Sequence, residues 1–285
     1  MNRVSFHSVL REAAALAGFT MARLTTTPKT QLKAFINRRA REYWDAHWWS
    51  QIMHAELRYY RDAYDAATAY ATGDEVYYAT TGYYYTALQS TTGNAPTNAT
   101  YWERTTELDA YIALAQTGEE EIGTVRLLSA DNPLETRHPR SQPFRLLGDR
   151  IQVLGEDVPS SIYVWFREPA PDWQGDDFSA SDTYATGDVV YYEGSATGYE
   201  GDYWTATAST SAGQDPEDTP AKWTRLEFPE WLRAPASSGA YADWLRQDGN
   251  PEAAQLEEAQ ARRLLLSAIH RDGRAQRQVL RSSGA

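Results

Sequence analysis

The sequence predicts an α+β protein with helical ends, a small central β sheet and two small all-β modules inserted between them. A nine-residue stretch occurs twice, at 70–78 and 184–192, with eight identical positions, which indicates an internal repeat. Both ends of the chain carry apolar residues at helical spacing, whereas 122–168 is rich in β-branched and aromatic residues. In chain order we expect N-terminal helices (1–63), a first module (64–106), a central β region (107–175), a second module (176–227) and C-terminal helices with a basic tail (228–285).

The N-terminal segment predicts two helices. Ser5 is a suitable N-cap for the first helix, and Gly18 stands at the position that usually ends one. The second helix opens at Thr27, with a proline at the next position where its missing N–H costs little. Its apolar spacing continues to Tyr60, so we expect a helix of more than about 45 Å.

Two histidines on this long helix are the first candidates for a metal site. His47 and His54 are seven residues apart and therefore share a face, with Glu56 nearby. Two helical turns separate them by about 10 Å, which is too far for one ion. Scattered surface histidines are the simpler interpretation, and we expect no metal and no cofactor.

Each repeat unit spans roughly 45 residues, the size of one small supersecondary unit. Its Gly-Asp pair is a turn signal, and the Val-Tyr-Tyr run that follows suits a half-buried pleated surface. An aromatic-Thr-Ala run then pairs with it as a hairpin. Trp102 and Trp223 stand at the end of the two units. We therefore expect each unit to be a three-stranded sheet whose tryptophan packs in its core.

The order of aromatic, Tyr-x-x-Gly-Asp-x-Val, aromatic-Thr-Ala, Gly, Pro and Trp resembles the type 3 chitin-binding carbohydrate-binding modules. Tyr64 and Phe178 stand where that family has an opening tryptophan, and the second unit carries an acidic insert around 200–202. The resemblance implies that aromatic rings stack on sugar. The best sugar-facing candidates are Tyr84, Tyr85, Tyr203 and Trp204. Packing in the module core is the alternative role for such side chains. We favour that role for Tyr70, Val76, Trp102, Tyr184, Val190 and Trp223.

The central region predicts β structure. The stretch 107–118 is apolar and fits either a short helix or a strand. Residues 144–154 predict a hairpin about Gly148-Asp149. Residues 162–167 predict a strand that ends before Pro169, because proline cannot donate to a ladder.

The C-terminal segment predicts two more helices. Tyr241, Trp244 and Leu245 share one face of the first helix, which Gly249 ends. Asn250 is an N-cap for a last long helix, with proline at its first position and an acidic residue in its first turn. A basic tail from Arg274 to Arg281 follows.

Charge is unevenly distributed along the chain. The formal net charge is −12, yet residues 1–64 carry +5 and residues 259–285 also carry +5, which leaves −22 for the middle. Basic ends around an acidic middle indicate that the two regions meet different partners. An equally simple interpretation is that the acidic residues keep a β-rich surface soluble.

Catalysis is not expected. The sequence has no phosphate loop, no serine-centred elbow, no zinc-protease motif and no cysteine. Acidic runs such as 119–121 and 176–177 could be imagined as glycosidase carboxylates, but charge runs in loops are usually only solvated. We therefore do not expect the protein to be an enzyme.

Membrane insertion is not expected either, because the apolar runs fall far short of the roughly 20 residues that cross a bilayer. The first residues lack the apolar core of a signal peptide. We therefore expect a protein that stays in the cytoplasm or enters a particle assembled there.

With the two repeat units removed, the order is helix, long helix, small sheet, helix, long helix and basic tail. Three stretches carry a resemblance to the head-to-tail adaptor, or connector, proteins of tailed bacteriophages: 36–44, 163–167 and 240–249. That resemblance implies a fold in which long terminal helices form the adaptor scaffold around the small central sheet.

The adaptor resemblance also implies partners. Proteins of that family form a ring, commonly a dodecamer, below the portal protein, and pass DNA through the lumen without specific binding. The C-terminal tail docks on the portal, which assigns that role to Arg271, Arg274, Arg277 and Arg281. A downstream tail or stopper protein would follow, and the location would be the neck of a virion assembled in the host cytoplasm.

The sequence therefore predicts a structural virion protein, a ring-forming adaptor whose modules decorate its surface. The alternative hypothesis is a non-catalytic protein that binds a chitin-like glycan and whose helices only oligomerise it. A secreted binder should carry a signal peptide and a linker, and a pull-down on polysaccharide would separate the two hypotheses.

Overall fold

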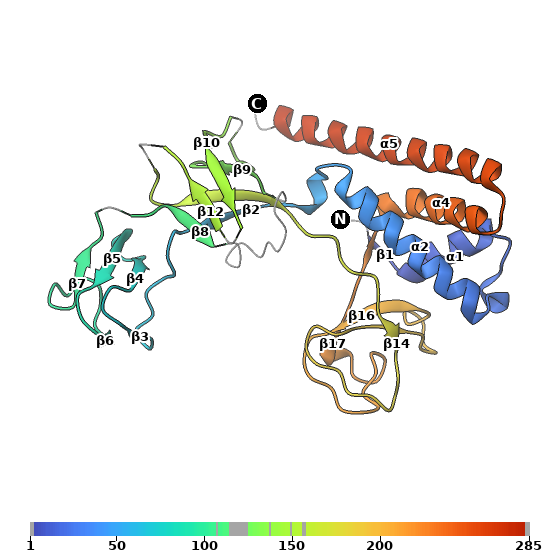
Figure 1. Ribbon diagram of the computed structural model, residues 1–285, viewed down its shortest axis with the longest axis horizontal. Coiled ribbons are helices and arrows are strands. Elements are labelled where there is room, and N and C mark those ends of the chain that lie inside the picture. Colours follow the sequence, from blue (N-terminus) through green and yellow to red (C-terminus); the bar gives the residue numbers. More distant parts are fainter. Residues whose placement is uncertain are drawn as a thin grey trace. The chain divides into compact units, whose positions relative to one another are not determined.

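The computed structural model of the chain divides into two compact units, Met1–Gln51 with Ala170–Ser282, and Ile52–Pro169 (Figure 1). It describes residues 3–106, 108–113, 125–136, 138–148, 150–155 and 158–282, with side chains of the last helix to residue 273. The predictions for 119–121, for Asp149 and for the side chains of Arg274, Arg277 and Arg281 lie outside the described residues.

The first unit holds the helices and one repeat module. Its helices are α1 (Phe6–Leu16), α2 (Thr26–Asp45), α4 (Glu230–Gln247) and α5 (Pro251–Ser282). Short strands β1 (Arg3–Val4) and β18 (Phe228–Pro229) pair antiparallel beside them. The module strands are β14 (Asp176–Asp177), β15 (Val189–Tyr192), β16 (Asp202–Ala206) and β17 (Trp223–Arg225).

The second unit is made of small sheets. One sheet has the order β10 (Ser141–Gln142), β9 (Val125–Ser129), β13 (Ile162–Arg167) and β2 (Met53–Arg58). Another has the order β11 (Phe144–Leu147), β12 (Arg150–Val153) and β8 (Tyr111–Ala113). The repeat module adds β3 (Ala69–Tyr70) with β6 (Thr91–Thr92), and β4 (Glu75–Tyr78), β5 (Tyr83–Ala87) and β7 (Trp102–Arg104).

The predicted helical scaffold with a long N-terminal helix is wrong, although the class is mixed α+β and a long C-terminal helix, α5, is present. Helix α2 ends at Asp45, and the stretch expected to continue it becomes strand β2. Most of the described strands belong to small antiparallel sheets, two of which replace the expected single central sheet. The long N-terminal helix is therefore absent from the described part of the chain.

The physical reason lies just after α2. The indole of Trp49 donates a hydrogen bond to the carbonyl of Tyr43 at 3.1 Å, so the chain folds back on the last helical turn. Beyond it, β2 pairs antiparallel with β13 over six residues, from Met53↔Arg167 to Arg58↔Ile162. The apolar spacing also fits a helix, but this long-range pairing decides the local structure.

Three of the predicted local signals are confirmed. Ser5 caps α1, with Ser8 N donating to its Oγ at 3.2 Å. Gly18 follows that helix with φ +82°, a conformation that glycine adopts without strain. Asn250 caps α5, since the backbone N–H of Ala253 donates to its Oδ1 at 3.2 Å.

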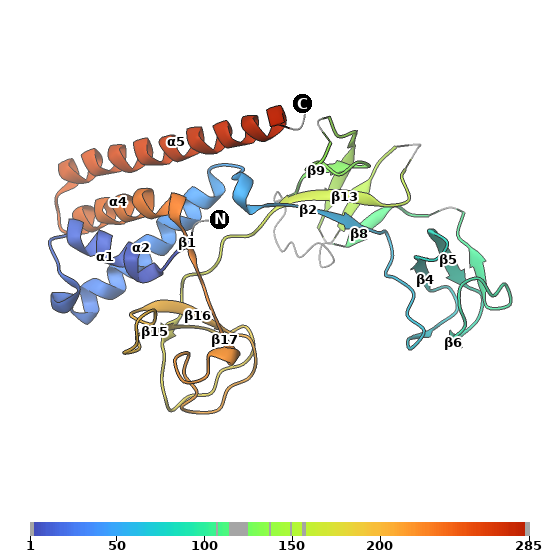
Figure 2. The same ribbon diagram turned by 180° about the vertical axis from the view of Figure 1, so that it is seen from behind.

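Helix α4 is the centre of the helical unit and packs against α1, α2 and α5 (Figure 2). Its buried residues are mostly small, and they include Ala236, Gly239 and Ala240. A Cβ at Gly239 would lie 2.7 Å from the hydroxyl of Tyr43 on α2. Glycine is therefore needed where these two helices approach each other.

A buried ion cluster joins α2 to α4. Arg39 donates Nε and Nη2 to the two carboxylate oxygens of Asp243 at 2.8 and 2.7 Å, and both side chains are buried. Arg38 and Arg246 also reach this carboxylate, at 2.5 and 2.7 Å. Burial raises the pKa of Asp243, but hydrogen bonds from Arg39 and Arg38 outweigh it and lower that pKa below its usual value.

Helix α5 lies along α4 and buries one narrow stripe. Ala254, Ala261 and Ala268 are seven residues apart and buried, whereas the residues between them are exposed or half-buried. Small side chains at this spacing let the two helix backbones come close. The outward face of α5 is therefore open in the chain described here.

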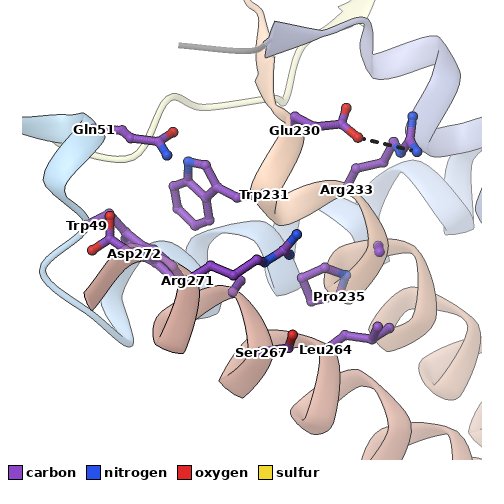
Figure 3. Close-up of a pocket in the computed structure, with 12 residues that line it drawn as sticks. Trp49, Gln51, Glu230, Trp231, Arg233, Pro235, Leu264, Ser267, Arg271 and Asp272 are labelled. Atoms are coloured by element: carbon purple, nitrogen blue, oxygen red, sulfur yellow. Dashed lines mark ion pairs between the residues drawn. The ribbon is translucent and has the colours of Figure 1, made fainter. Parts of the chain in front are cut away.

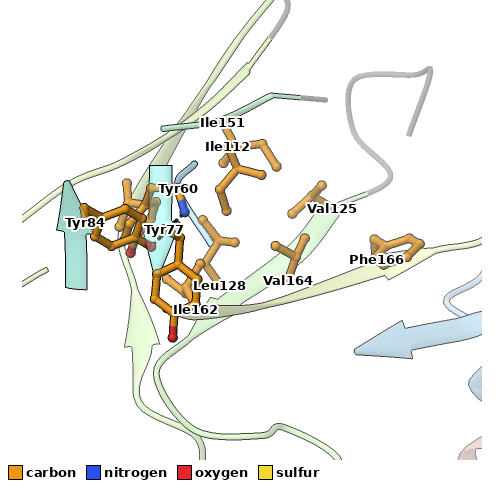
Figure 4. Close-up of a cluster of buried hydrophobic side chains, with 11 residues drawn as sticks. Tyr60, Tyr77, Tyr84, Ile112, Val125, Leu128, Ile151, Ile162, Val164 and Phe166 are labelled. Carbon is orange, nitrogen blue, oxygen red and sulfur yellow. Dashed lines mark hydrogen bonds between the residues drawn. The ribbon is translucent and has the colours of Figure 1, made fainter. Parts of the chain in front are cut away.

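The core of the second unit lies between its sheets (Figure 4). It includes Ile112 from β8, Ile151 from β12, and Leu128 and Val164 from β9 and β13. The predicted strand 162–167 and the hairpin about Gly148 are confirmed, with Leu147 paired to Arg150. Of 107–118, described residues 111–113 form a strand, while 107 and 114–118 lie outside the description.

Candidate functional site

The two repeat modules share one core arrangement. The first is the predicted three-stranded sheet, and the second adds the short parallel strand β14. Both closing tryptophans are buried, and their indoles donate to equivalent loops, Trp102 to Asn94 O at 2.9 Å and Trp223 to Gln214 O at 3.2 Å. The six residues that we favoured for the core are buried or half-buried in these clusters.

The opposite face of the first module's sheet docks the module onto its own unit. Tyr77 stacks on Tyr59 with ring centroids 3.9 Å apart. Tyr84 donates its hydroxyl to Ser160 O at 2.8 Å. Its hydroxyl also accepts from Tyr60 N at 3.0 Å (Figure 4). Burial raises the pKa of Tyr84 to about 12, against a smaller opposing effect of the Tyr60 N–H.

The second module uses the corresponding pair, Tyr191 and Tyr203. Tyr203 packs edge-on against Phe6 of α1 at 4.8 Å, and the ammonium of Lys33 lies 3.7 Å from the ring centroid of Tyr191. Burial raises the pKa of both tyrosines well above the usual value. The same two sheet positions thus attach each repeat to a different host surface.

These contacts determine how far the four predicted sugar-facing residues are exposed to solvent. Tyr84 and Tyr203 are 6% and 2% exposed, because their rings form the docking contacts. Trp204 is also buried and stacks on Tyr199 at 5.1 Å. Tyr85 is half-buried and packs against the core of the first module. Three of the four rings are therefore covered by the protein's own residues.

An exposed ring that sequence reasoning missed is Tyr83, at 44% exposure. It neighbours Tyr84 on β5, so the alternation of side chains along the strand turns it to the other face. The guanidinium carbon of Arg104 lies 3.6 Å from its ring centroid. The period-two alternation of a strand could have distinguished Tyr83 from Tyr84.

Tyr203 also borders a hollow of about 550 Å³ between α2 and the second module. Lys33, Trp173 and Asp177 line it as well. The ammonium of Lys33 already donates to Asp177 Oδ1 at 2.9 Å. The one lysine of this lining is therefore already paired with a carboxylate of the module.

A second cavity, of about 500 Å³, opens between α4 and α5 within the first unit (Figure 3). Its apolar lining includes Trp231, Pro235 and Leu264. Trp231 stacks on the buried Trp49, with ring centroids 3.8 Å apart and an interplanar angle of 27°. The two stacked rings form an aromatic side of the cavity.

Most charges around the cavity between α4 and α5 are already paired. Arg233 lies 3.3 Å from both Glu230 and Glu12. The buried carboxylate of Asp272 lies 3.1 Å from His47 Nε2 and accepts from Ser50 N at 3.2 Å.

Arg271 is the exposed charged residue of this lining. It is exposed, and it forms no ion pair with another described residue. It was predicted as part of a portal-docking tail, together with three arginines whose side chains are not described. The structure thus places one predicted docking residue at the mouth of a cavity.

The interpretation of two histidines on one helix is wrong. His47 follows α2 and contacts Asp272, whereas His54 lies on strand β2, 3.5 Å from Glu168. Among the described residues, no group of His, Asp or Glu side chains could hold a metal ion. None of the described helices is both long and apolar enough to cross a membrane.

No protein-family model matches the sequence, and no curated protein matches it. The resemblances to phage adaptors and to chitin-binding modules therefore stay predictions from the residues quoted above.

Proposed function

We propose that the protein is a ring-forming head-to-tail adaptor of a tailed-phage particle. It docks on the portal protein, extends the DNA channel and presents a platform to the next tail component. Its role is structural, without catalysis or cofactor. The two modules decorate its surface and are held by their tyrosine pairs.

The observation that carries this proposal is the open face of α5. Leu256 and Leu266 are 76% and 53% exposed on a helix of 32 residues, about 48 Å long. Its inward face buries little more than an alanine stripe. Single exposed leucines are common on protein surfaces, but we infer that these two, on one long helix, belong to a surface that another chain covers. In a ring, the neighbouring subunit supplies that cover.

Charge supports the same proposal. The basic stretch 259–285 contrasts with the acidic middle of the chain, so the C-terminal helix is suited to an acidic surface of the portal. Acidic residues that line a channel repel DNA, because phosphate binding is electrostatic. DNA would then pass through the lumen without binding.

Sedimentation velocity of the full chain with purified portal protein tests the proposal. We expect the chain to co-sediment with the portal, and the double variant Leu256→Asp, Leu266→Asp to lose this assembly. Leu134→Asp is the matched control, since Leu134 is 60% exposed but lies in the β unit. Equal assembly of the double variant and the control would contradict the proposed interface.

The carbohydrate-binding alternative predicts a different outcome. A chain that stays monomeric, does not bind the portal protein and binds chitin beads would favour the carbohydrate-binding alternative. The test variant for that outcome is Tyr83→Ala, because Tyr83 is the exposed ring of the first module.

A further inference from the structure

We infer that the cavity between α4 and α5 binds an acidic peptide segment of a partner protein, and that Arg271 holds a carboxylate of that segment. This inference goes beyond the proposed function, because it concerns the chemistry of what the cavity receives. It holds whichever protein carries the segment.

The size and floor of the cavity suit a peptide. A volume of about 500 Å³ lies within the range of roughly 300–1,000 Å³ that is usual for ligand sites. Trp231, Pro235 and Leu264 offer an apolar surface for one large side chain (Figure 3). The stack of Trp49 under Trp231 keeps this surface in place before binding.

The charges select an acidic segment. Arg233 is engaged by Glu230 and Glu12, and the carboxylate of Asp272 is buried and accepts from Ser50 N, so Arg271 is the exposed charge of the lining. The exposed guanidinium of Arg271 offers several N–H donors in a planar fork that matches a carboxylate. The basic character of 259–285 adds a longer-range attraction for acidic residues.

Two neutral polar residues on the rim favour a peptide over a simple organic acid. Gln51 and Ser267 line the same cavity. An amide and a hydroxyl both donate and accept hydrogen bonds, which suits the N–H and C=O groups of a peptide backbone. A bound segment would then place one apolar side chain on Trp231 and one carboxylate at Arg271.

Fluorescence polarisation of the full chain tests this site with two labelled peptides. One peptide alternates aspartate with phenylalanine, and the other alternates lysine with phenylalanine. We expect the acidic peptide to bind and the basic peptide not to bind. Arg271→Glu should weaken binding at least about tenfold, the loss expected for one charge-assisted hydrogen bond. Ser267→Phe should weaken it similarly by filling the cavity without any change of charge.

Arg23→Glu is the matched control, because Arg23 is exposed in the same unit, lies outside the basic stretch 259–285 and does not line this cavity. It makes the same change in charge and should leave binding within about twofold of the parent chain. Circular dichroism confirms that each variant is folded. The inference is overturned if the acidic peptide does not bind, if both peptides bind equally, or if Arg23→Glu weakens binding as much as Arg271→Glu.

Discussion

Asp202 is a carboxyl group that the fold buries completely, at the start of strand β16 in the second module. It accepts the backbone N–H of His7 at 3.3 Å and lies 4.0 Å from Arg225. Burial raises its pKa to about 6, although the His7 N–H and Arg225 act in the opposite direction. The folded protein therefore binds this proton more tightly than the unfolded chain does.

The raised pKa predicts how stability depends on pH. The protonated carboxyl stabilises the fold fully below its ordinary pKa of 3.8, and this contribution is lost as pH rises through about 6. Asp202→Asn stays neutral at every pH, so we expect it to raise the free energy of unfolding by about 1–3 kcal/mol near pH 8. Urea denaturation at about pH 4, 6 and 8 measures this difference.

The advantage of Asp202→Asn should shrink toward pH 4, where the parent carboxyl is protonated. Asp218→Asn is the control, since Asp218 is an exposed carboxyl of the same module. A parent chain at least as stable as Asp202→Asn near pH 8 would show that the buried carboxylate is better solvated than its position indicates.

At the scale of elements, local signals predicted much of the structure. Helix α1 with its Ser5 cap, the start of α5 at Asn250 and strand β13 all follow from spacing and capping chemistry within a few residues. The repeat predicted the module sheets and their buried tryptophans, because each small core is built from residues within one unit. Such features depend on neighbours in the sequence.

Features that depend on distant partners were not predictable. Residues 53–58 fit a helical pattern, but β13 lies about a hundred residues further on and pairs with them. Tyr84 and Tyr203 looked free to bind sugar, because nothing within a module shows that Phe6 or Ser160 covers them. The cavity beside Arg271 is assembled from three separate stretches of chain, so no motif marks it.

The contact between α4 and α5 gives a prediction at this scale. Ala261 is buried in the stripe that faces α4, whereas Ala259 is exposed on the same helix. Ala261→Leu should destabilise the helical unit by about 1–3 kcal/mol, because extra methylenes force closely packed helices apart. Ala259→Leu should change stability by less than about 0.5 kcal/mol. Thermal denaturation of both variants makes the comparison, and equal shifts would mean that α5 is not closely packed there.

At the scale of the whole molecule, the chain forms two units that each carry one repeat module. Each module is attached through the same pair of sheet positions, so one repeated β unit packs against two different surfaces of the chain. The helical unit leaves α5 with exposed leucines and a basic end. These two properties are the ones that a subunit needs for lateral contacts and for an acidic docking partner.

Negative-stain imaging of the purified chain mixed with portal rings tests the adaptor proposal most directly. The account predicts rings of this chain, or added density that caps one end of the portal along its channel axis. Portal rings without added density, together with a chain that stays monomeric, would contradict it.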